Sequence, residues 1–272
     1  MSLNKRLINT GGGGGIDIST ATLAYTTSGV SIGRAPRTFD ISNNGTILTS
    51  TDEVNRITTF DLPTAWDLNG RTSRGYMANF GQHAFNNHCE HNSRATGYLF
   101  ATSNPIQDYT KTCSGTIYSA GGVSGGSLLW SNLGNQWVEQ ASFSNAGTNL
   151  YPISINYLAQ FSCGAYSPNT SLTYIRRVSK AEMGFGSGAM RGIYVSEDGL
   201  HLFISGATTS STTSYILKQY SLSTPYDIST YTFVSQLDVT GTGSAIFDIK
   251  FSTDLSTIFV LAGNNNYYVY NT

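Results

Sequence analysis

Apolar and polar residues alternate in short runs along this chain, and one unit of the pattern recurs. The unit is a serine followed six positions later by an aliphatic residue. The residue before the serine is apolar in four of five copies, and the residue after the aliphatic position is aromatic in four of five. This pattern predicts a strand, a turn and a second strand in each copy. The copies are Ser42/Leu48, Ser93/Leu99, Ser144/Leu150, Ser196/Leu202 and Ser252/Ile258.

The copies stand 51, 51, 52 and 56 residues apart. A further match, between residues 60–68 and residues 220–228, marks the end of a third strand and the connection to a fourth, such as Tyr231–Asp238. Four antiparallel strands in about 50 residues are typical of a propeller blade. The sequence therefore predicts an all-β fold, a five-bladed β-propeller with four antiparallel strands per blade. We also expect the turn serine to bond the backbone two residues on.

The fifth copy reaches Thr272 before its fourth strand appears, and the missing strand is found at the other end of the chain. Asp-Ile-Ser-Thr occurs at residues 17–20 and again at 227–230, where it leads into the fourth strand of the preceding copy. We therefore expect residues 16–28 to pair with the strand at 267–270, so that the N-terminal strand completes the C-terminal blade and covers its edge. The predicted division is an arm over 1–15 and a propeller over 16–272.

Composition narrows the classes of partner. Charged residues make up 11% of the chain and the formal net charge is −1, so we expect no nucleic-acid partner. No run approaches the roughly 18 apolar residues of a membrane span, and the first ten residues lack the apolar segment of a secretion signal, so we expect no membrane insertion. Cys89, Cys113 and Cys163 are scattered and odd in number, which favours buried thiols over disulfides.

The repeat spacing aligns one residue at the start of each innermost strand. A mixed ring of this kind at the channel mouth binds a polar or anionic ligand, or its charges satisfy one another between neighbouring blades. The loops on the same side vary most between copies and carry Arg34, His83, Trp137 and Phe185, where an exposed aromatic ring can stack on a sugar. The aligned residues are Arg37, His88, Glu139, Arg191 and Phe247; the candidate ligand-binding residues are Arg34, Arg37, His88, Trp137, Glu139 and Arg191.

Two groups of residues carry side chains suited to metal binding or catalysis. His83, His88 and His91 lie near Cys89 and Glu90, but strand alternation leaves no set of zinc ligands on one face, so we expect no metal and no cofactor. Glycoside hydrolases use paired carboxylates. The carboxylates expected on inner strands are Asp40, Glu90, Glu139 and Asp248, but none lies in a catalytic motif, so we expect no enzyme.

Two segments carry a resemblance to known proteins. YSLSTPYDISTYTFVSQLDVTG, at 220–241, resembles a propeller repeat of structural and tail-associated proteins of tailed bacteriophages. MSLNKRLINTGGGGG looks like the N-terminal arm of virion proteins from marine tailed phages. The resemblance implies a virion protein and does not fix which one. Taken with the lack of a catalytic motif, it leads us to expect a non-enzymatic structural protein that is made in the host cytoplasm and displayed on the exterior of the virion, as a tail fibre or tail-associated protein or a capsid decoration protein.

The arm itself suggests how such a protein docks. Fifteen extended residues reach at most about 50 Å, and five glycines make the segment flexible. We expect other virion proteins of the tail or capsid to be the partners; the docking residues are Leu3, Lys5, Arg6, Leu7 and Ile8. The alternative function is a glycan-binding adhesin for host attachment, with glycoside hydrolysis a further alternative.

Overall fold

The computed structural model describes residues 16–29, 36–42, 44–52, 57–77, 87–91, 96–102, 106–112, 117–120, 132, 139–162, 173–209 and 214–272. Within these ranges it describes only the backbone of residues 37, 51, 52, 57, 76, 77 and those between 87 and 120.

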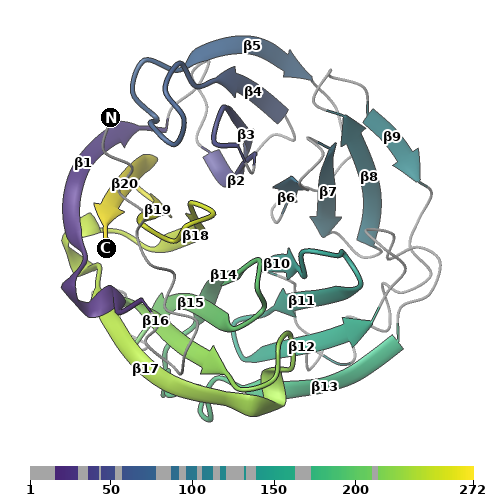
Figure 1. Ribbon diagram of the computed structural model, residues 1–272, viewed down its shortest axis with the longest axis vertical. Helices are drawn as coiled ribbons and strands as arrows, with labels where there is room; N and C mark the ends of the chain where they lie inside the picture. The colour runs from purple at the N-terminus through teal and green to yellow at the C-terminus, as the bar shows by residue number, and fades with distance from the viewer. Residues whose placement is uncertain are drawn as a thin grey trace, which may run out of the picture.

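The described strands form five four-stranded antiparallel sheets (Figure 1). Sheet one contains β2 (Pro36–Ile41), β3 (Ile47–Asp52), β4 (Ile57–Asp61) and β5 (Thr72–Met77). Sheet two contains β6 (Asn87–His91), β7 (Thr96–Thr102), β8 (Ile106–Thr112) and β9 (Ile117–Ala120). Sheet three contains β10 (Gln140–Phe143), β11 (Asn149–Ile153), β12 (Tyr157–Ser162) and β13 (Thr173–Ser179). Sheet four contains β14 (Met190–Val195), β15 (His201–Ala207), β16 (Tyr215–Leu222) and β17 (Tyr231–Asp238). Sheet five contains β18 (Ile246–Phe251), β19 (Thr257–Ala262), β20 (Asn266–Asn271) and β1 (Thr22–Ser28).

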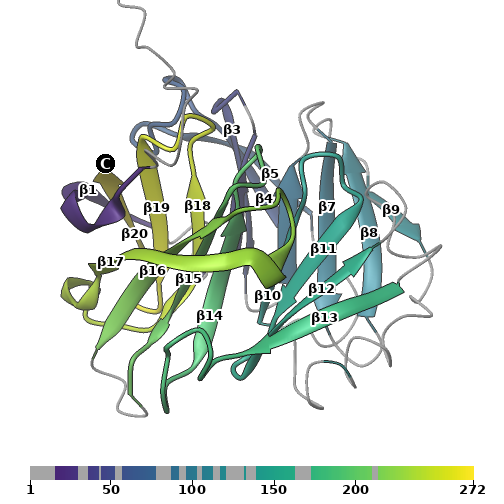
Figure 2. The ribbon, with the colours of Figure 1, turned by 60° about the horizontal axis from the view of Figure 1, so that its bottom comes forward.

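The sheets stand around a common centre, each with its first strand innermost (Figures 1 and 2). The innermost strands β2, β6, β10, β14 and β18 contact one another in that order, and β18 contacts β2 again. The ring is therefore continuous through the described strands. The predicted all-β propeller is confirmed. No helix among the described residues is long and apolar enough to span a membrane.

The turn between the first and second strands has one geometry in all four sheets where it is described. The serine oxygen accepts the backbone N–H five residues on: Ser42 from Ile47 (3.0 Å), Ser144 from Asn149 (3.0 Å), Ser196 from His201 (2.9 Å) and Ser252 from Thr257 (3.0 Å). The predicted serine bond to the backbone two residues on is thus wrong. In three of these turns an Asn or Asp stands two residues on, and its side chain accepts the serine hydroxyl and a backbone N–H; these residues are Asn44, Asp198 and Asp254.

A second contact fixes this turn to the connection between the third and fourth strands. The backbone N–H of Trp66 donates to the Gly45 carbonyl at 2.8 Å, and that of Tyr226 donates to the Gly199 carbonyl at 2.9 Å. A Cβ atom on either glycine would lie 2.5–2.7 Å from the aromatic ring of its partner, so a side chain has no room there. Both glycines have φ +71°, a backbone region that favours glycine.

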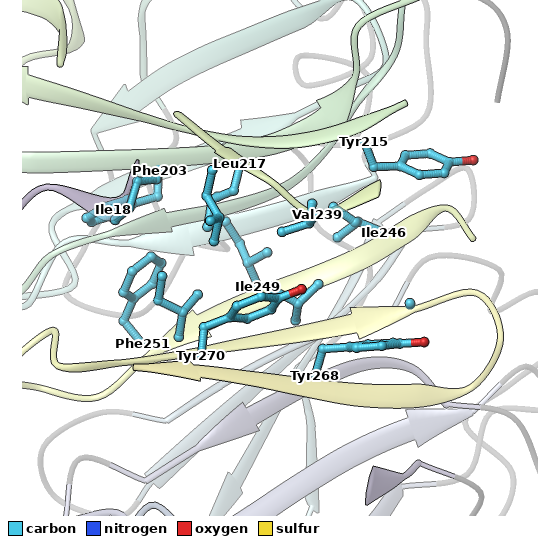
Figure 3. Close-up of a cluster of buried hydrophobic side chains, with 14 of the residues drawn as sticks. Ile18, Phe203, Tyr215, Leu217, Val239, Ile246, Ile249, Phe251, Tyr268 and Tyr270 are labelled. Atoms are coloured by element: carbon cyan, nitrogen blue, oxygen red, sulfur yellow. The ribbon is translucent and has the colours of Figure 1, made fainter. Parts of the chain in front are cut away.

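The hydrophobic core lies between neighbouring sheets rather than within one of them. One buried cluster joins sheets four and five, where the rings of Phe203 and Phe251 stack with centroids 4.1 Å apart (Figure 3). A second cluster joins sheets three and four, and a third joins sheets five and one. Burial of apolar surface between sheets thus holds the ring together.

Sheet five is completed by β1, which pairs with β20 in antiparallel register. Leu23 lies opposite Tyr270, and Thr27 lies opposite Tyr267. The predicted pairing of the N-terminal strand with residues 267–270 is confirmed. The strand is shorter than the 16–28 expected, because Ile18–Thr20 form a 3₁₀ turn (η1) that leads into it. Its counterpart η2 covers Ile228–Thr230, and a third described 3₁₀ turn, η3, covers Thr240–Thr242.

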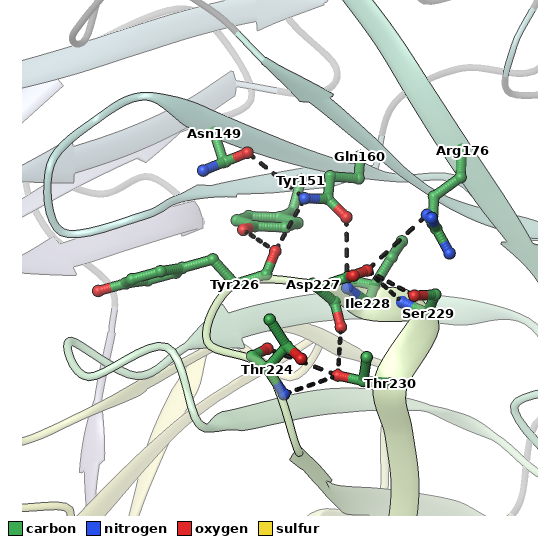
Figure 4. Close-up of polar contacts among 10 residues, drawn as sticks. All are labelled: Asn149, Tyr151, Gln160, Arg176, Thr224, Tyr226, Asp227, Ile228, Ser229 and Thr230. Atoms are coloured by element: carbon green, nitrogen blue, oxygen red, sulfur yellow. Dashed lines mark hydrogen bonds and ion pairs between the residues drawn. The ribbon is translucent and has the colours of Figure 1, made fainter.

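The repeated Asp-Ile-Ser-Thr segment has the same structure at both places. Asp227 accepts the Ser229 hydroxyl at 2.7 Å and the Ser229 backbone N–H at 2.8 Å, and these two hydrogen bonds hold the pKa of Asp227 below its usual value (Figure 4). Ile228 is fully buried, and its N–H donates to the Gln160 side chain at 3.3 Å. Gln160 in turn donates to the Tyr226 carbonyl at 2.8 Å. A glutamine on the third strand of sheet three therefore holds the connection of sheet four.

Gln219 does the same one sheet further on. Its side-chain oxygen accepts the backbone N–H of Ile18 at 3.2 Å, and its amide donates to the Ile16 carbonyl. Asp17 accepts the N–H of Ser19 at 2.9 Å, as Asp227 does with Ser229. Gln219 therefore holds the segment that leads into β1 of sheet five in the way that Gln160 holds the segment that leads into β17 of sheet four.

Candidate functional site

The candidate site lies where the innermost strands begin. Arg37 and His88 are the second residues of β2 and β6, and Arg191 and Phe247 are the second residues of β14 and β18. Glu139 directly precedes β10. The backbone thus places all five aligned positions at corresponding points of the ring. The side chains of Arg37 and His88 lie outside the described residues.

Glu139 and Arg191 form an ion pair between neighbouring sheets. Nη1 of Arg191 donates to Oε2 of Glu139 at 2.6 Å, a short charge-assisted hydrogen bond. The Glu139 side chain is 17% exposed and that of Arg191 is 38% exposed. Of the two interpretations of the aligned residues, the one in which charges satisfy one another between neighbouring sheets is therefore correct for Glu139 and Arg191. The Arg191 side chain still meets solvent.

Asp248 joins sheets five and one. It is fully buried on β18, and Oδ2 accepts the Thr38 hydroxyl at 2.7 Å and the Phe39 N–H at 3.0 Å. Its other oxygen accepts the Ile249 N–H at 2.8 Å. Three donors compensate for the cost of burying this carboxyl group. Asp248, a candidate catalytic carboxylate from the sequence, is therefore engaged with backbone and hydroxyl donors of its own sheet and the neighbouring one.

Gln140 reaches between two inner strands that are not neighbours in the ring. Its side-chain amide donates to the Phe247 carbonyl at 3.4 Å, although β14 stands between β10 and β18. Gln140 is 2% exposed. The Gln140 side chain therefore connects sheets three and five directly.

The loop that precedes β14 does not display its aromatic residue. Phe185 is fully buried, and the Lys218 ammonium group lies 5.1 Å from its ring centroid. The same ammonium group donates to the Gly184 carbonyl at 2.8 Å, and burial lowers the pKa of Lys218. The expectation that Phe185 forms part of a recognition surface is therefore wrong, because the ring packs into the core between sheets three and four.

The other predicted site residues fall outside the described part of the chain. These are Arg34, Trp137, the side chains of the His83–His91 segment, and the docking residues Leu3, Lys5, Arg6, Leu7 and Ile8. Among the residues that are described, no three His, Cys, Asp or Glu side chains are grouped as a metal site would require. Asp40 is buried on β2.

Several residues that join the sheets were missed from the sequence. Gln160 and Gln219 stand in the similar tetrapeptides AQFS (159–162) and KQYS (218–221), and this similarity could have identified them. Their separation of 59 residues departs from the repeat spacing, because the loops between them differ in length. No sequence similarity of this kind identifies Gln140. Its partner, the Phe247 carbonyl, depends on the distance between sheets three and five.

Comparisons with known proteins give no family. No family model matches the chain, and no curated protein matches it. Among solved structures, it is similar to a functionally unknown protein from Desulfotomaculum acetoxidans (10% identity, TM-score 0.46, 84% of this chain and 65% of that one). It is also similar to the β-propeller domain of Myceliophteria thermophila Cps50 (Swd1) (7% identity, TM-score 0.49, 93% and 99%). A chain of the mitotic checkpoint complex is a third (10% identity, TM-score 0.45, 86% and 62%). This chain thus spans less than two thirds of two of those chains, and the likeness brings no activity with it.

Proposed function

We propose that the protein is a non-enzymatic structural component of a tailed phage particle. In this proposal the five sheets act as five blades of a rigid propeller on the particle exterior, in the tail or on the capsid. The arm over residues 1–15 attaches the propeller to another virion protein. The virion assignment comes from the resemblance of residues 1–15 and 220–241 to phage proteins.

One observation supports the structural over the catalytic role. Three described groups on or beside the inner strands are engaged between sheets: Glu139 with Arg191, Asp248 with Thr38 and Phe39, and Gln140 with Phe247. A general acid or nucleophile must be able to approach its substrate. Groups held in this way instead stabilise the arrangement of the sheets.

The docking role of the arm is tested by incorporation into particles. A variant with Leu3, Leu7 and Ile8 changed to serine keeps the length of the arm and removes its apolar side chains. We expect it to fold as the natural chain does but to be absent from purified particles, and we expect a variant with only Lys5 and Arg6 changed to glutamine to be retained in part. Normal amounts of the serine variant in particles would exclude docking through the apolar residues.

The second candidate is a glycan-binding adhesin, which is favoured by the partly exposed side chain of Arg191 at the start of β14. Particles that lack the protein discriminate between the two. Fragile or unassembled particles support the structural role, whereas intact particles that fail to adsorb to the host support the adhesin. Glycoside hydrolysis would be supported by release of reducing sugar from host polysaccharide that is lost in Glu139→Gln.

A further inference from the structure

The chain contains two Asn–Gly pairs, Asn44–Gly45 and Asn69–Gly70. In such a pair the backbone nitrogen of the glycine can attack the side-chain amide carbon of the asparagine, because glycine has no side chain to obstruct the approach and adopts the required backbone freely. The reaction requires a mobile asparagine side chain and a backbone N–H that is not held elsewhere. The two pairs differ in both respects.

The side-chain oxygen of Asn44 is held by three donors, although the residue is exposed. Its side-chain oxygen accepts the Ser42 hydroxyl at 2.8 Å, the Thr46 N–H at 3.2 Å and the Thr46 hydroxyl at 2.8 Å. The nitrogen that would attack, that of Gly45, donates to the Ser42 carbonyl at 2.6 Å. The Trp66 ring covers Gly45. Attack would break these bonds before any new one forms.

Asn69 lies in an open turn between β4 and β5. Asn69 and Gly70 are both exposed, and a Cβ atom on Gly70 would meet only the Pro63 ring, at 3.6 Å. The Asn69 backbone N–H donates to Asp67 at 2.9 Å. Within the described part of the chain, neither the Asn69 side-chain amide nor the Gly70 N–H has a hydrogen-bond partner.

We propose that Asn69 is a site of spontaneous deamidation and that Asn44 is protected by the fold. The Gly70 nitrogen forms a bond to Cγ of Asn69, and the side-chain amide leaves as ammonia, which gives a five-membered succinimide ring. Water then opens the ring at one carbonyl or the other and yields aspartate or isoaspartate. The second product carries an additional methylene group in the main chain.

The position of this turn gives the modification a structural effect. Leu68 and Arg71, on either side of the pair, connect sheet one to β1: the Leu68 N–H donates to the Tyr25 hydroxyl at 2.9 Å, and Arg71 donates to the Ser28 carbonyl. Arg71 also donates to the Leu68 carbonyl at 2.9 Å. A longer main chain between Leu68 and Arg71 changes their spacing, so the contacts that hold β1 against sheet one are weakened.

Deamidation is measured by incubating the folded protein at mildly alkaline pH and following the mass gain of about one dalton in each Asn–Gly peptide. Enzymatic methylation of isoaspartate identifies the product. We expect the peptide with Asn69 to be modified several-fold faster than the peptide with Asn44, and we expect the two rates to converge in protein unfolded by urea. Equal rates in the folded protein, or an unchanged difference in urea, would overturn the proposal.

The structural effect is tested by hydrogen exchange at β1 before and after incubation. We expect faster exchange at β1 in the aged natural chain, and unchanged exchange in aged Asn69→Gln, which cannot react at this rate. Fresh Asn69→Asp has the added charge without the added methylene group and should exchange as the fresh natural chain does. Equal loss of protection in Asn69→Gln would show that isoaspartate at this turn is not the cause.

Discussion

At the scale of single residues, the turn after the first strand of each sheet demands a left-handed backbone. The fourth residue of the turn has positive φ in all four described cases: Gly45, Gly147, Gly199 and Leu255. In sheet five this position is a leucine instead of a glycine. Leu255 belongs to the buried cluster against which Ile16 packs. Ile16 precedes Asp17 as Tyr226 precedes Asp227, so the two residues hold equivalent positions in the repeat. In sheet four the Tyr226 ring lies against Gly199. Burial of Leu255 in this cluster, where it is 7% exposed, thus offsets the cost of its positive φ, about 1 kcal/mol or more.

We expect Gly199→Ala to destabilise the protein by about 1–3 kcal/mol, since the new methyl group requires a strained φ and meets the Tyr226 ring. The measurement is the free energy of unfolding in urea. Gly241→Ala is the matched control, because nothing lies within 4 Å of its added Cβ atom. A similar loss of unfolding free energy in both variants would contradict the packing of the Gly199 turn against the Tyr226 side chain.

At the scale of strands, β1 and β20 carry three tyrosines whose hydroxyl groups resist ionisation. Burial raises the pKa of Tyr25, Tyr267 and Tyr270 to about 12, from an ordinary value of 10.0. In the unfolded chain these groups lose their protons at lower pH than in the folded protein. Their contribution to stability is therefore complete below pH 10 and is lost as pH rises through about 12.

We expect the free energy of unfolding in urea to fall as pH rises from about 10 to about 12, and we expect the fall to be smaller in Tyr267→Phe, which has no proton to lose at this position. The difference in phenolate absorbance between the folded natural chain and folded Tyr267→Phe should appear late in the same interval. An equally steep fall in Tyr267→Phe would show that another group controls the alkaline transition.

The elements that could be predicted from the sequence are those whose pattern is local. Tyr231–Asp238 is a strand with the predicted bounds, and the pairing of the N-terminal strand followed from one repeated tetrapeptide. The site could be predicted only as a column of positions. The bond from Gln140 to Phe247 and the burial of Phe185 under Lys218 depend on distances between sheets, which the spacing of residues along the chain does not determine.

At the scale of the whole molecule, the ring is held at sheet five by a strand from the opposite end of the chain. Ile18 is fully buried between sheets four and five, and β1 covers the edge of β20. An uncovered strand edge invites pairing with other chains. The segment from 16 to 28 therefore contributes both buried apolar surface and the protection of an edge.

We expect a chain that starts at residue 29 to melt at a lower temperature and to aggregate, whereas a chain that starts at residue 16 should melt as the full chain does. Thermal unfolding with light scattering distinguishes the two. We expect the chain that starts at residue 16 to keep its melting temperature because the described contacts of the N-terminal segment begin at Ile16. Equal melting of both truncated chains would show that β1 is dispensable for closure.

The pairing of β1 with β20 also constrains the order of events when the protein is made. Thr22 lies opposite Asn271, so the ribosome must synthesise almost the entire propeller before this strand finds its partner. Contacts so distant in sequence form slowly, and sheets one to four can fold earlier from nearby residues. Until β20 emerges, the nascent chain carries an unpaired N-terminal strand, and the cell must keep it from pairing with the wrong edge.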